Sequence, residues 1–315
     1  MYDKEFATHV DIGLSKYPKE LSSKYLYDDK GSSIFQSIMQ MSEYYPTKSE
    51  HEILSNKQND FYQHFPNHKP LEFIELGAGD GKKIVPFLKY FKNNNTDFYY
   101  KPVDISASAL ENLEARLSKA LPDITVNSIH DDFFHALSSI KDQTDVHPVY
   151  LFLGGNIGNF THELTIDFLK NIRENINTGD LLIIGFDLKK DPRIIQKAYD
   201  DPHGITASFN INILNRINNE LEANFNPDNF RHYAYYNPEN GIVSSKLYST
   251  KDQTVYIKKL EKSYHFNQWE FIHTEISRKF DIPSIEKLAE STGFSIVDHI
   301  YDRKKYFTDT ILQAK

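Results

Sequence analysis

Short apolar runs alternate with amphipathic segments along the middle of the chain. Five runs stand out: "LEFIEL" (71–76), "FYYKPV" (98–103), "ITVNSI" (124–129), "VYLFLG" (149–154) and "LLIIGF" (181–186). Runs of this length that are almost entirely apolar are typical of strands buried on both faces. Between the runs, apolar residues recur every three or four positions, which indicates helices. The pattern therefore predicts an α/β fold with a parallel sheet that is covered by helices on both faces.

The helical segments also predict which side chains face the sheet. Ser106 is a suitable N-cap for the second helix. At the end of the chain, "SIEKLAESTGFSIVDHIYD" and "KKYFTDTILQA" predict a helix and two strands, which would add an antiparallel hairpin to the sheet. The expected inward faces are Ile84, Phe87, Leu88 and Phe91 in the first helix, Leu110, Leu113 and Leu117 in the second, and Leu164, Phe168 and Ile172 in another.

The segment 189–280 interrupts this regular order. It is rich in asparagine, as in "FNINILNRINNELEANFNPDNF", and then turns to alternating strand patterns such as "KLYSTKDQTVYIKKL". We predict a cofactor-binding domain of residues 48–188 and 281–315, with a Rossmann-like sheet. We also predict a smaller inserted α+β domain of residues 1–47 and 189–280, which would bind the substrate and act as a lid.

Composition narrows the function classes. The net charge of −8, without a basic block, argues against nucleic acid as a partner. The absence of cysteine excludes disulfides, thiolate catalysis and cysteine-based zinc sites. The histidines show neither the H-x-H nor the H-E-x-x-H spacing of metal sites, and no stretch reaches 18 apolar residues. We expect a cytoplasmic, soluble monomer that binds a small molecule and no metal, nucleic acid or membrane.

A glycine turn, "FIELGAGDGKK" (73–83), follows the first apolar run. The dinucleotide pattern G-x-G-x-x-G requires glycine where Lys82 stands, so NAD is disfavoured. The G-x-G-x-G form with a preceding acid suits S-adenosylmethionine, which has no pyrophosphate. Asp104 ends the next strand, where a carboxylate would accept both ribose hydroxyls. Asp132 and Phe133 follow the third strand, where they would bond the adenine amino group and pack on the base. A turn of purely structural purpose is the alternative.

The stretch "LFLGGNIGNF" (151–160) follows the fourth strand. Its two glycine-bearing turns place Asn156 and Asn159 at the carboxyl edge of the sheet, which is the usual ligand side. An asparagine amide accepts a hydrogen bond from an amine and donates one to a carboxylate, which suits an amino-acid ligand. The simpler explanation, an asparagine that stabilises its own turn, applies more readily to Asn156 than to Asn159.

Several blocks together resemble a known family. "KYLYDDKGSSIFQSIMQMSEYYPTKSEHEIL", "ELGAGDGKK", "PVDIS", "FLGGNIGN", "GFDLKKDP", "AYDDPHGITASFNINIL" and "HTEISRKF" occur in the order typical of the histidine N-alpha-methyltransferases of ergothioneine biosynthesis. The resemblance runs from about residue 20 to the C-terminus. It implies a class I methyltransferase fold that uses S-adenosyl-L-methionine to methylate the α-amine of an amino acid. Relatives act on tryptophan or its derivatives.

The resemblance also implies roles for individual residues. Asn159 and Tyr199 would hold the amino and carboxylate end of the substrate, and Tyr44, Glu275 and Ser277 would face its side chain. Asn159, Tyr44 and Glu275 are the implied catalytic residues. The implied cofactor contacts are Tyr27, Gly77, Lys83, Asp104, Asp132 and Phe133, and the implied amino-acid contacts are Phe35, Tyr44, Gly154, Asn159, Tyr199, Ser245, Glu275 and Ser277.

Two positions depart from the family pattern. Ser245, in "IVSSKLY", stands where the histidine enzymes often have methionine, and a smaller residue there would widen the side-chain pocket. The glycine turn reads "GAGDGKK" where those enzymes usually have Ser or Thr with Glu. The second change concerns the cofactor loop and leaves the chemistry unaffected.

Simpler explanations exist for several of these residues. Phe35 and Tyr44 would serve equally as core aromatics, and Lys83 as a surface lysine. Strand alternation puts Glu275, Ser277 and Lys279 on one side and Thr274 on the other. Exposure of the first side to solvent would be enough to explain its polar residues. Asp200 and Asp201, in "AYDDP", are expected to form a solvated turn.

The expected function is methylation of the α-amine of L-histidine, up to the trimethylated product hercynine. The alternatives are an N-methyltransferase of tryptophan or of another aromatic or modified amino acid, and a cofactor-binding sensor protein without turnover. An NAD-dependent oxidoreductase fails at Lys82 and lacks a hydride-transfer partner.

Overall fold

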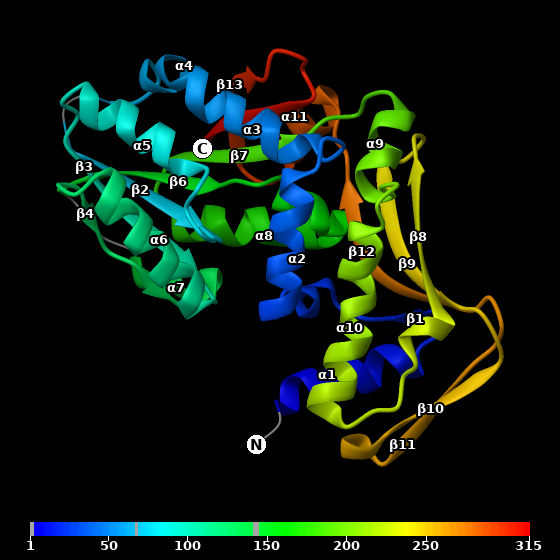
Figure 1. The fold of residues 1–315 in the computed structure, drawn as a ribbon. Coiled ribbons are helices and arrows are strands. Elements are labelled where there is room, and N and C mark those ends of the chain that lie inside the picture. The colour runs from blue at the N-terminus through cyan, green and yellow to red at the C-terminus, as the bar shows by residue number, and fades with distance from the viewer. Residues whose placement is uncertain (1–2, 67–68, 141–144) are drawn as a thin grey trace. The chain divides into compact units, whose positions relative to one another are not determined.

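The computed structural model describes residues 3–66, 69–140 and 145–315. The chain divides into two compact units. The first unit comprises Met1–Tyr45 and Lys190–Arg278, and the second comprises Pro46–Lys189 and Lys279–Lys315 (Figure 1). Among the described residues, no helix is long and apolar enough to cross a membrane.

The second unit is built on one mixed sheet with the strand order β13-β14-β7-β6-β2-β3-β4. The strands β6, β2 and β3 are parallel neighbours, and β7 is parallel to β6. β14 runs antiparallel to both β7 and β13, so the expected parallel sheet and its terminal antiparallel hairpin are confirmed. The bounds of these strands are β2 Leu71–Leu76, β3 Phe98–Asp104, β4 Thr125–Val126, β5 Ile129–His130, β6 His147–Phe152, β7 Leu181–Asp187, β13 Phe294–Tyr301 and β14 Phe307–Ala314.

The strand expected at 124–129 is interrupted. Its residues form two short strands, β4 and β5, which pair with β3 at the same offset in register, Tyr99 with Thr125 and Val103 with Ile129. The gap faces Lys101 and Pro102 of β3. Proline has no backbone N–H to donate, so the ladder is broken at that position.

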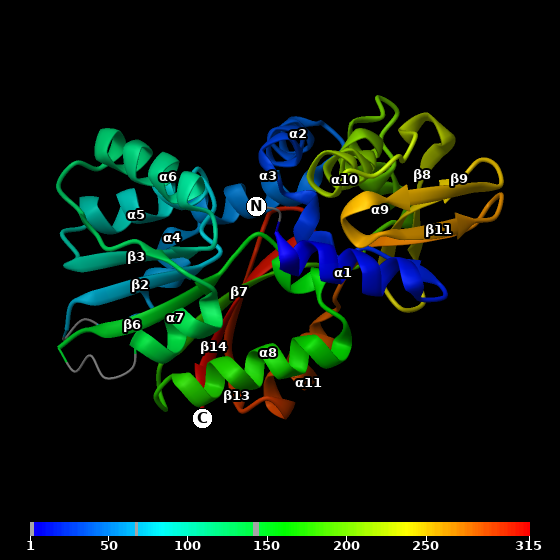
Figure 2. The same ribbon diagram turned by 90° about the horizontal axis from the view of Figure 1, so that it is seen from below.

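Helices cover both faces of this sheet, as Figure 2 shows for α5 and α6 on one side and α8 on the other. One hydrophobic core joins the sheet to α3, α4, α5 and α6, and a second joins it to α7, α8 and α11. The helix bounds are α3 Tyr45–Asn56, α4 Gln58–Tyr62, α5 Ile84–Asn93, α6 Ala107–Ala120, α7 Phe133–Ile140, α8 His162–Asn175 and α11 Ile282–Ser291.

The expected inward faces of α5 and α6 are buried, and Ser106 caps α6 by accepting the Ala109 N–H at 3.2 Å. The prediction for α8 is wrong at Leu164, which is 55% exposed. Thr165 is buried in place of Leu164, and its hydroxyl donates to the Thr161 carbonyl at 2.7 Å. A hydroxyl that is paired in this way needs no water and can be buried. Phe168 and Ile172 face the core as expected.

The first unit contains a four-stranded sheet of order β1-β12-β9-β8 and a separate β10-β11 hairpin. Helices α9 and α10 contact β8 and β9, and α2 packs on α10. The helices α2 and α10 and the strands β8, β9 and β12 share one hydrophobic core with α1. The bounds are α1 Lys4–Ser15, β1 Lys19–Glu20, η1 Ser23–Leu26, α2 Asp29–Gln40, α9 Pro192–Tyr199, α10 Ile205–Leu221, β8 Phe230–Asn237, β9 Ile242–Ser249, β10 Gln253–Ile257, β11 Lys262–Phe266 and β12 Phe271–Arg278.

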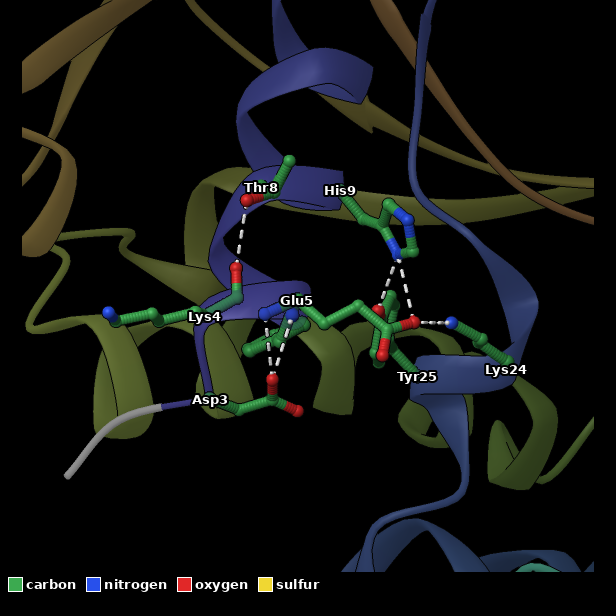
Figure 3. A network of polar contacts seen from close by, with 8 residues as sticks. Asp3, Lys4, Glu5, Thr8, His9, Lys24 and Tyr25 are labelled. Atoms are coloured by element: carbon green, nitrogen blue, oxygen red, sulfur yellow. Dashed lines mark hydrogen bonds and ion pairs between the residues drawn. The ribbon is translucent and has the colours of Figure 1, made fainter. Parts of the chain in front are cut away.

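Polar contacts fasten α1 to η1, the turn that leads to Tyr27 (Figure 3). Asp3 caps α1 by accepting the N–H groups of Glu5 and Phe6. The His9 ring nitrogen Nδ1 lies 2.6 Å from the Tyr25 hydroxyl, and the Lys24 ammonium lies 2.5 Å from the Glu5 carboxylate. The N-terminal helix is thereby tied to the segment that carries an implied cofactor residue.

Buried asparagines explain the unusual composition of α10. The Asn212 amide donates to Asp28 at 2.7 Å, and Asn210 accepts the Thr274 hydroxyl at 2.5 Å. The expectation of a solvated turn is wrong for Asp201, which is 7% exposed and accepts N–H groups at the start of α10. Burial alone would raise the pKa of Asp201, but these N–H donors, led by Thr206, lower it below its usual value.

Candidate active site

Three glycines form the turn between β2 and α5 in the second unit. Gly77, Gly79 and Gly81 all have positive φ (74°, 59° and 69°), a conformation that favours glycine. A Cβ atom at Gly77 or Gly79 would meet nothing within 4 Å, whereas at Gly81 it would lie 2.8 Å from Leu113 Cγ. Gly81 therefore serves packing against α6. The backbone at Gly77 and Gly79 borders open space, as close approach of a ligand requires.

Asp104, at the end of β3, is anchored to this turn. One carboxylate oxygen accepts the Gly79 N–H at 2.9 Å and the other accepts the Ser106 N–H at 2.9 Å. Each oxygen keeps a further lone pair for another donor. The two backbone bonds fix the direction of the carboxylate and hold it beside the glycine turn.

Asp132 and Phe133 stand at the start of α7. Asp132 is exposed, and one of its oxygens accepts the His135 N–H at 3.4 Å. Phe133 is half-buried and packs edge-on against Phe168, with ring centroids 5.5 Å apart. Phe133 therefore contributes to the core beneath α7 and α8, and part of its surface remains accessible.

Lys83 lies in a buried polar cluster, which we call the Glu50 cluster and define as Glu50, Glu75, Lys83, Tyr100 and Asp309. The Lys83 ammonium donates to Glu50 Oε2 at 2.6 Å. The Gly154 N–H donates to Glu50 Oε1 at 2.5 Å. Burial would lower the pKa of Lys83, but the charges of Glu50 and Glu75 raise it, so the amine is protonated. The surface-lysine alternative is thereby contradicted.

Glu75, the acid before the glycine turn, belongs to the same cluster. Burial raises the pKa of Glu75 to about 7, although the Tyr100 hydroxyl donates to its carboxylate at 2.5 Å. Burial and the neighbouring Glu75 likewise raise the pKa of Tyr100 well above its usual value. Lys82, by contrast, pairs with Asp80 at 3.0 Å near the surface.

Asn156 and Asn159 lie in a short 3-10 helix, η2 (Asn156–Asn159), directly after β6. Gly154 and Gly155 precede it with positive φ (92° and 68°) and turn the chain at the carboxyl edge of the sheet. Asn156 is exposed and Asn159 is half-buried. The two amides therefore differ in environment although they share one turn.

In the first unit, an aromatic cluster joins α2, α9 and α10, and we define it as Tyr27, Phe35, Tyr44, Tyr199 and Phe209. Tyr27 packs against Phe35 and Phe209, with ring centroids 5.3 Å apart in both cases. Phe35 reaches Tyr44 at 6.1 Å, and Tyr44 reaches Tyr199 at 6.2 Å. Phe35 and Tyr44 are half-buried and not enclosed in the core.

Two phenols of this cluster are linked to side chains of β12: Tyr27 is affected by the charge of Glu275, and Tyr199 contacts Ser277. Although 39% of Tyr27 is exposed, burial of its hydroxyl raises the pKa of Tyr27 well above its usual value. The charge of Glu275 adds to this effect, followed by Tyr44 and Tyr199. The Tyr199 hydroxyl is 2.9 Å from the Ser277 hydroxyl in a buried contact. The structure thus brings Tyr27, Tyr44, Tyr199 and the β12 side chains together.

A bulge in β12 between His273 and Glu275 adjusts this face of the strand. Glu275 stands opposite Ser245 of β9, and Ser277 stands opposite Val243. Ser245 and Ser277 are 2% and 7% exposed. Since directly opposed residues share a face of the sheet, Glu275 and Ser277 lie on the covered face as expected. The simpler explanation, a polar face turned to solvent, is contradicted.

Two expectations for this strand need correction. Thr274 was expected on the opposite face, yet it is buried as the extra residue of the bulge and donates to the Ser245 carbonyl at 3.0 Å. Lys279 does not continue the polar face, because it lies beyond β12 in the second unit and pairs with Asp187 at 2.7 Å.

Sequence reasoning missed Glu50, Tyr100, Phe209 and Asp309. Tyr100 and Phe209 look like ordinary core aromatics in the sequence, and Asp309 stands in an apolar strand. An isolated acid in "FTDTIL" is a usable signal, because strands buried on both faces rarely carry one without a role. Among the described residues, no group of three or more His, Asp or Glu side chains has the arrangement of a metal site.

Comparison with known proteins identifies the class. Residues 6–314 match the family described as "Histidine-specific methyltransferase, SAM-dependent". The histidine N-alpha-methyltransferase of Mycobacterium tuberculosis is 34% identical over 271 residues, which cover 86% of this chain and 83% of that protein. The enzyme of the same name from Mycolicibacterium smegmatis is 32% identical over 283 residues, covering 90% and 87%. An L-tryptophan methyltransferase of Psilocybe serbica is 26% identical over 307 residues, covering 89% and 85%.

The strand order and these matches define a methyltransferase of the α/β class I type that depends on S-adenosylmethionine. More narrowly, the chain belongs to the histidine-specific, S-adenosylmethionine-dependent methyltransferase family. The expected family, cofactor and enzyme class are confirmed.

The position of Asp104 leads to a prediction for cofactor binding. Asp104→Ala removes charge-assisted bonds worth about 1.5–3 kcal/mol in total, so the Kd for S-adenosylhomocysteine should rise by one to two orders of magnitude in titration calorimetry. Asp80→Ala, in the same turn but paired with Lys82, is the matched control and should bind normally. Equal affinity in Asp104→Ala and the parent would contradict the ribose assignment.

Proposed function

We propose that this enzyme methylates the α-amino group of L-histidine, up to three times, as in ergothioneine biosynthesis. The observation that carries the proposal is the grouping of Glu275 with Ser277, Tyr199, Tyr44 and Tyr27 in the first unit. The family match supports it, and the names of the mycobacterial relatives point to the same acceptor.

We assign cofactor binding mainly to the second unit. Gly77 offers backbone next to open space, Asp104 offers an anchored carboxylate, and Lys83 offers an ammonium group. Asp132 and Phe133, at the start of α7, are assigned to the adenine. Tyr27 of the first unit is assigned to the cofactor by resemblance alone. When bound, S-adenosylmethionine supplies a methyl group on a positively charged sulfur.

The chain has to present a neutral amine to that methyl group. The pKa of the α-amine of a free amino acid lies well above 7, so only a small fraction is neutral at that pH and the site has to favour the neutral form. With both partners bound, the neutral amine would take the methyl group and the sulfur would keep the electron pair of the broken carbon–sulfur bond. The first two transfers would leave an N–H proton to be removed, whereas before the third transfer the dimethylated amine would have to lose its proton first. We assign Asn159 to holding the amine and Tyr44 or Glu275 to accepting the proton, directly or through water. Orientation then supplies much of the rate enhancement.

Recognition of the imidazole ring is assigned to the first unit. Imidazole has one donor and one acceptor nitrogen, which a carboxylate and a hydroxyl satisfy together. Glu275 and Ser277 offer these groups two residues apart on one strand face. Phe35 supplies apolar surface beside Tyr44, and Tyr199 bonds Ser277.

A second acceptor, tryptophan or a modified histidine, rests on one observation. Ser245 is small, buried and directly opposite Glu275, where the histidine enzymes often have methionine. A smaller residue leaves more room for a larger ring. The L-tryptophan methyltransferase among the relatives shows that the family includes that specificity.

Mass spectrometry tests the function directly. The enzyme is incubated with S-adenosylmethionine and each of the twenty amino acids, and the methyl groups added to each are counted. We expect histidine to gain up to three methyl groups and the aliphatic amino acids to gain none. Binding of S-adenosylhomocysteine without methylation of any amino acid would support the sensor alternative and contradict the proposal.

A further inference from the structure

Glu50 connects two segments that are assigned to the active site. It lies on α3, remote in sequence from both, and its side chain is 1% exposed. One carboxylate oxygen accepts a hydrogen bond from the ammonium of Lys83, the residue before α5. The other accepts a hydrogen bond from the backbone N–H of Gly154, which lies after β6. A single buried carboxylate therefore sets the distance between the lysine and the turn that leads to Asn159.

The backbone around Glu50 leaves space for this carboxylate. A Cβ atom at Gly185 of β7 would lie 2.5 Å from Glu50 Oε1 and 3.0 Å from the Phe307 ring. A Cβ atom at Gly154 would lie 3.0 Å from Lys83 Nζ. Glycine stands at both positions where the carboxylate and the ammonium approach the main chain most closely. Glycines in one strand, β7, and in the turn after β6 thus leave room for the ion pair.

Three carboxyl groups share this region with one ammonium group. Glu75 faces it from β2 with Tyr100 from β3, and Asp309 faces it from β14. Asp309 is fully buried, and neither of its oxygens has a hydrogen-bond partner among the described residues. Burial and the charge of Glu50 raise the pKa of Asp309 well above its usual value, which favours its neutral form. Glu50 is then the carboxylate that contacts Lys83.

We propose that Glu50 is a positioning residue for cofactor binding, which holds the Lys83 ammonium and the Gly154 turn in the orientation that S-adenosylmethionine requires. The inference rests on the proposed cofactor role of Lys83. Glu50 acts through Lys83 and not by contact of its own with the cofactor. Loss of the Glu50 charge would free the Lys83 side chain to adopt other rotamers. The cofactor would then have to restrict these rotamers when it binds, which lowers its affinity.

The rival explanation is that Glu50 only fastens α3 to the sheet. A fastening role predicts a lower melting temperature and the same effect whether or not Lys83 is present. A positioning role predicts an effect on cofactor affinity that depends on Lys83. Coupling of this kind is what a double-mutant cycle measures.

The experiment compares Glu50→Gln, Lys83→Met and the double variant in the full-length enzyme. Glutamine keeps an acceptor for the Gly154 N–H and nearly the same volume but removes the charge. We expect Glu50→Gln to raise the Kd for S-adenosylhomocysteine about tenfold in calorimetry, since charged hydrogen bonds exceed neutral ones by roughly that factor. In the Lys83→Met background the same substitution should change the Kd less than about twofold. The KM for S-adenosylmethionine should rise more than kcat falls.

Glu52→Gln is the matched control, because Glu52 lies on the same helix and accepts the Arg303 N–H at 3.0 Å. It should bind S-adenosylhomocysteine normally. If Glu50→Gln does not fold, Glu50→Asp keeps the charge but shortens the reach, and about a threefold loss that vanishes in the Lys83→Met background is expected.

Each outcome decides a separate point. Normal binding by Glu50→Gln beside weakened binding by Lys83→Met would overturn the role of Glu50 and leave Lys83 in the site. An equal loss in both backgrounds would establish fastening of α3 and overturn positioning. Normal binding by Lys83→Met would overturn the assignment of Lys83 and the inference with it, while histidine methylation would stand.

Discussion

Replacing Asn159 by alanine is expected to lower kcat with histidine by a factor of about 100 or more, which is typical when one positioned hydrogen-bonding group is lost from a transition state. Asn159 is half-buried at the end of η2, after two glycines that turn the chain at the carboxyl edge of the sheet. If its amide holds the acceptor amine, its loss removes orientation and leaves cofactor binding intact. Steady-state kinetics and calorimetry with S-adenosylhomocysteine measure the two effects separately.

Asn156→Ala is the matched control, because Asn156 is the same residue type in the same 3-10 helix and is exposed. It should retain most of the activity. A fall of several degrees in the melting temperature of Asn159→Ala, with affinity and kcat reduced together, would show that Asn159 stabilises its turn. Full activity would remove Asn159 from the site.

The regular part of the fold was predictable because burial on both faces leaves a plain mark in the sequence. β2 was predicted at 71–76 and occupies Leu71–Leu76, since every position in it is buried. The terminal hairpin was predictable for a related reason, because β14 is nearly all buried and the hairpin of β13 and β14 follows an amphipathic helix. Such strands need no tertiary information to be recognised.

Other features depend on contacts that only the fold creates. The prediction for the inward face of α8 is wrong because the Thr165 hydroxyl donates to a carbonyl of the preceding turn and can therefore be buried. The spacing of apolar residues along the helix does not reveal such a bond. α10 was obscured by asparagines, which have low helix propensity, until their partners, such as Asp28 for Asn212, are known. Glu50 and Glu52 look alike in "SEHEIL", yet Glu50 is buried and pairs with the Lys83 ammonium, whereas Glu52 accepts a backbone N–H near the surface.

Asp104, Asp132, Phe133 and Asn159 were predictable from their places after strands, and the other candidate site residues were named from resemblance. The physical setting of each came from the structure. The sequence was equally consistent with Lys83 as a surface lysine, whereas the structure pairs its ammonium with Glu50. For Glu275 the sequence was also consistent with a position facing solvent. The bulge in β12 places it on the same face of the sheet as Ser245. Their roles stay predictions, and the sharpest concerns the choice of substrate.

Histidine is expected to outcompete tryptophan by at least tenfold in kcat/KM, and Glu275→Ala is expected to erase most of that preference. A ring that offers no hydrogen bond to Glu275 or to the Ser277–Tyr199 pair would desolvate these polar groups without compensation, at about 1–3 kcal/mol. An indole offers one donor and no acceptor, so it satisfies fewer of these groups than imidazole does. Competition assays with histidine, its mono- and dimethylated forms and tryptophan at equal concentration measure the preference.

Ser245→Met completes this test, because Ser245 lies directly opposite Glu275 and the substitution restores the commoner family residue. Ser245 is buried, so a longer side chain there should reduce kcat/KM for tryptophan more than for histidine, since overfilling penalises the larger ring. A tenfold advantage for tryptophan in the parent enzyme would contradict histidine as substrate and leave the methyltransferase class unchanged. An unaltered preference in Glu275→Ala would show that its carboxylate does not contact the ring, and the specificity would then have to arise from the aromatic cluster.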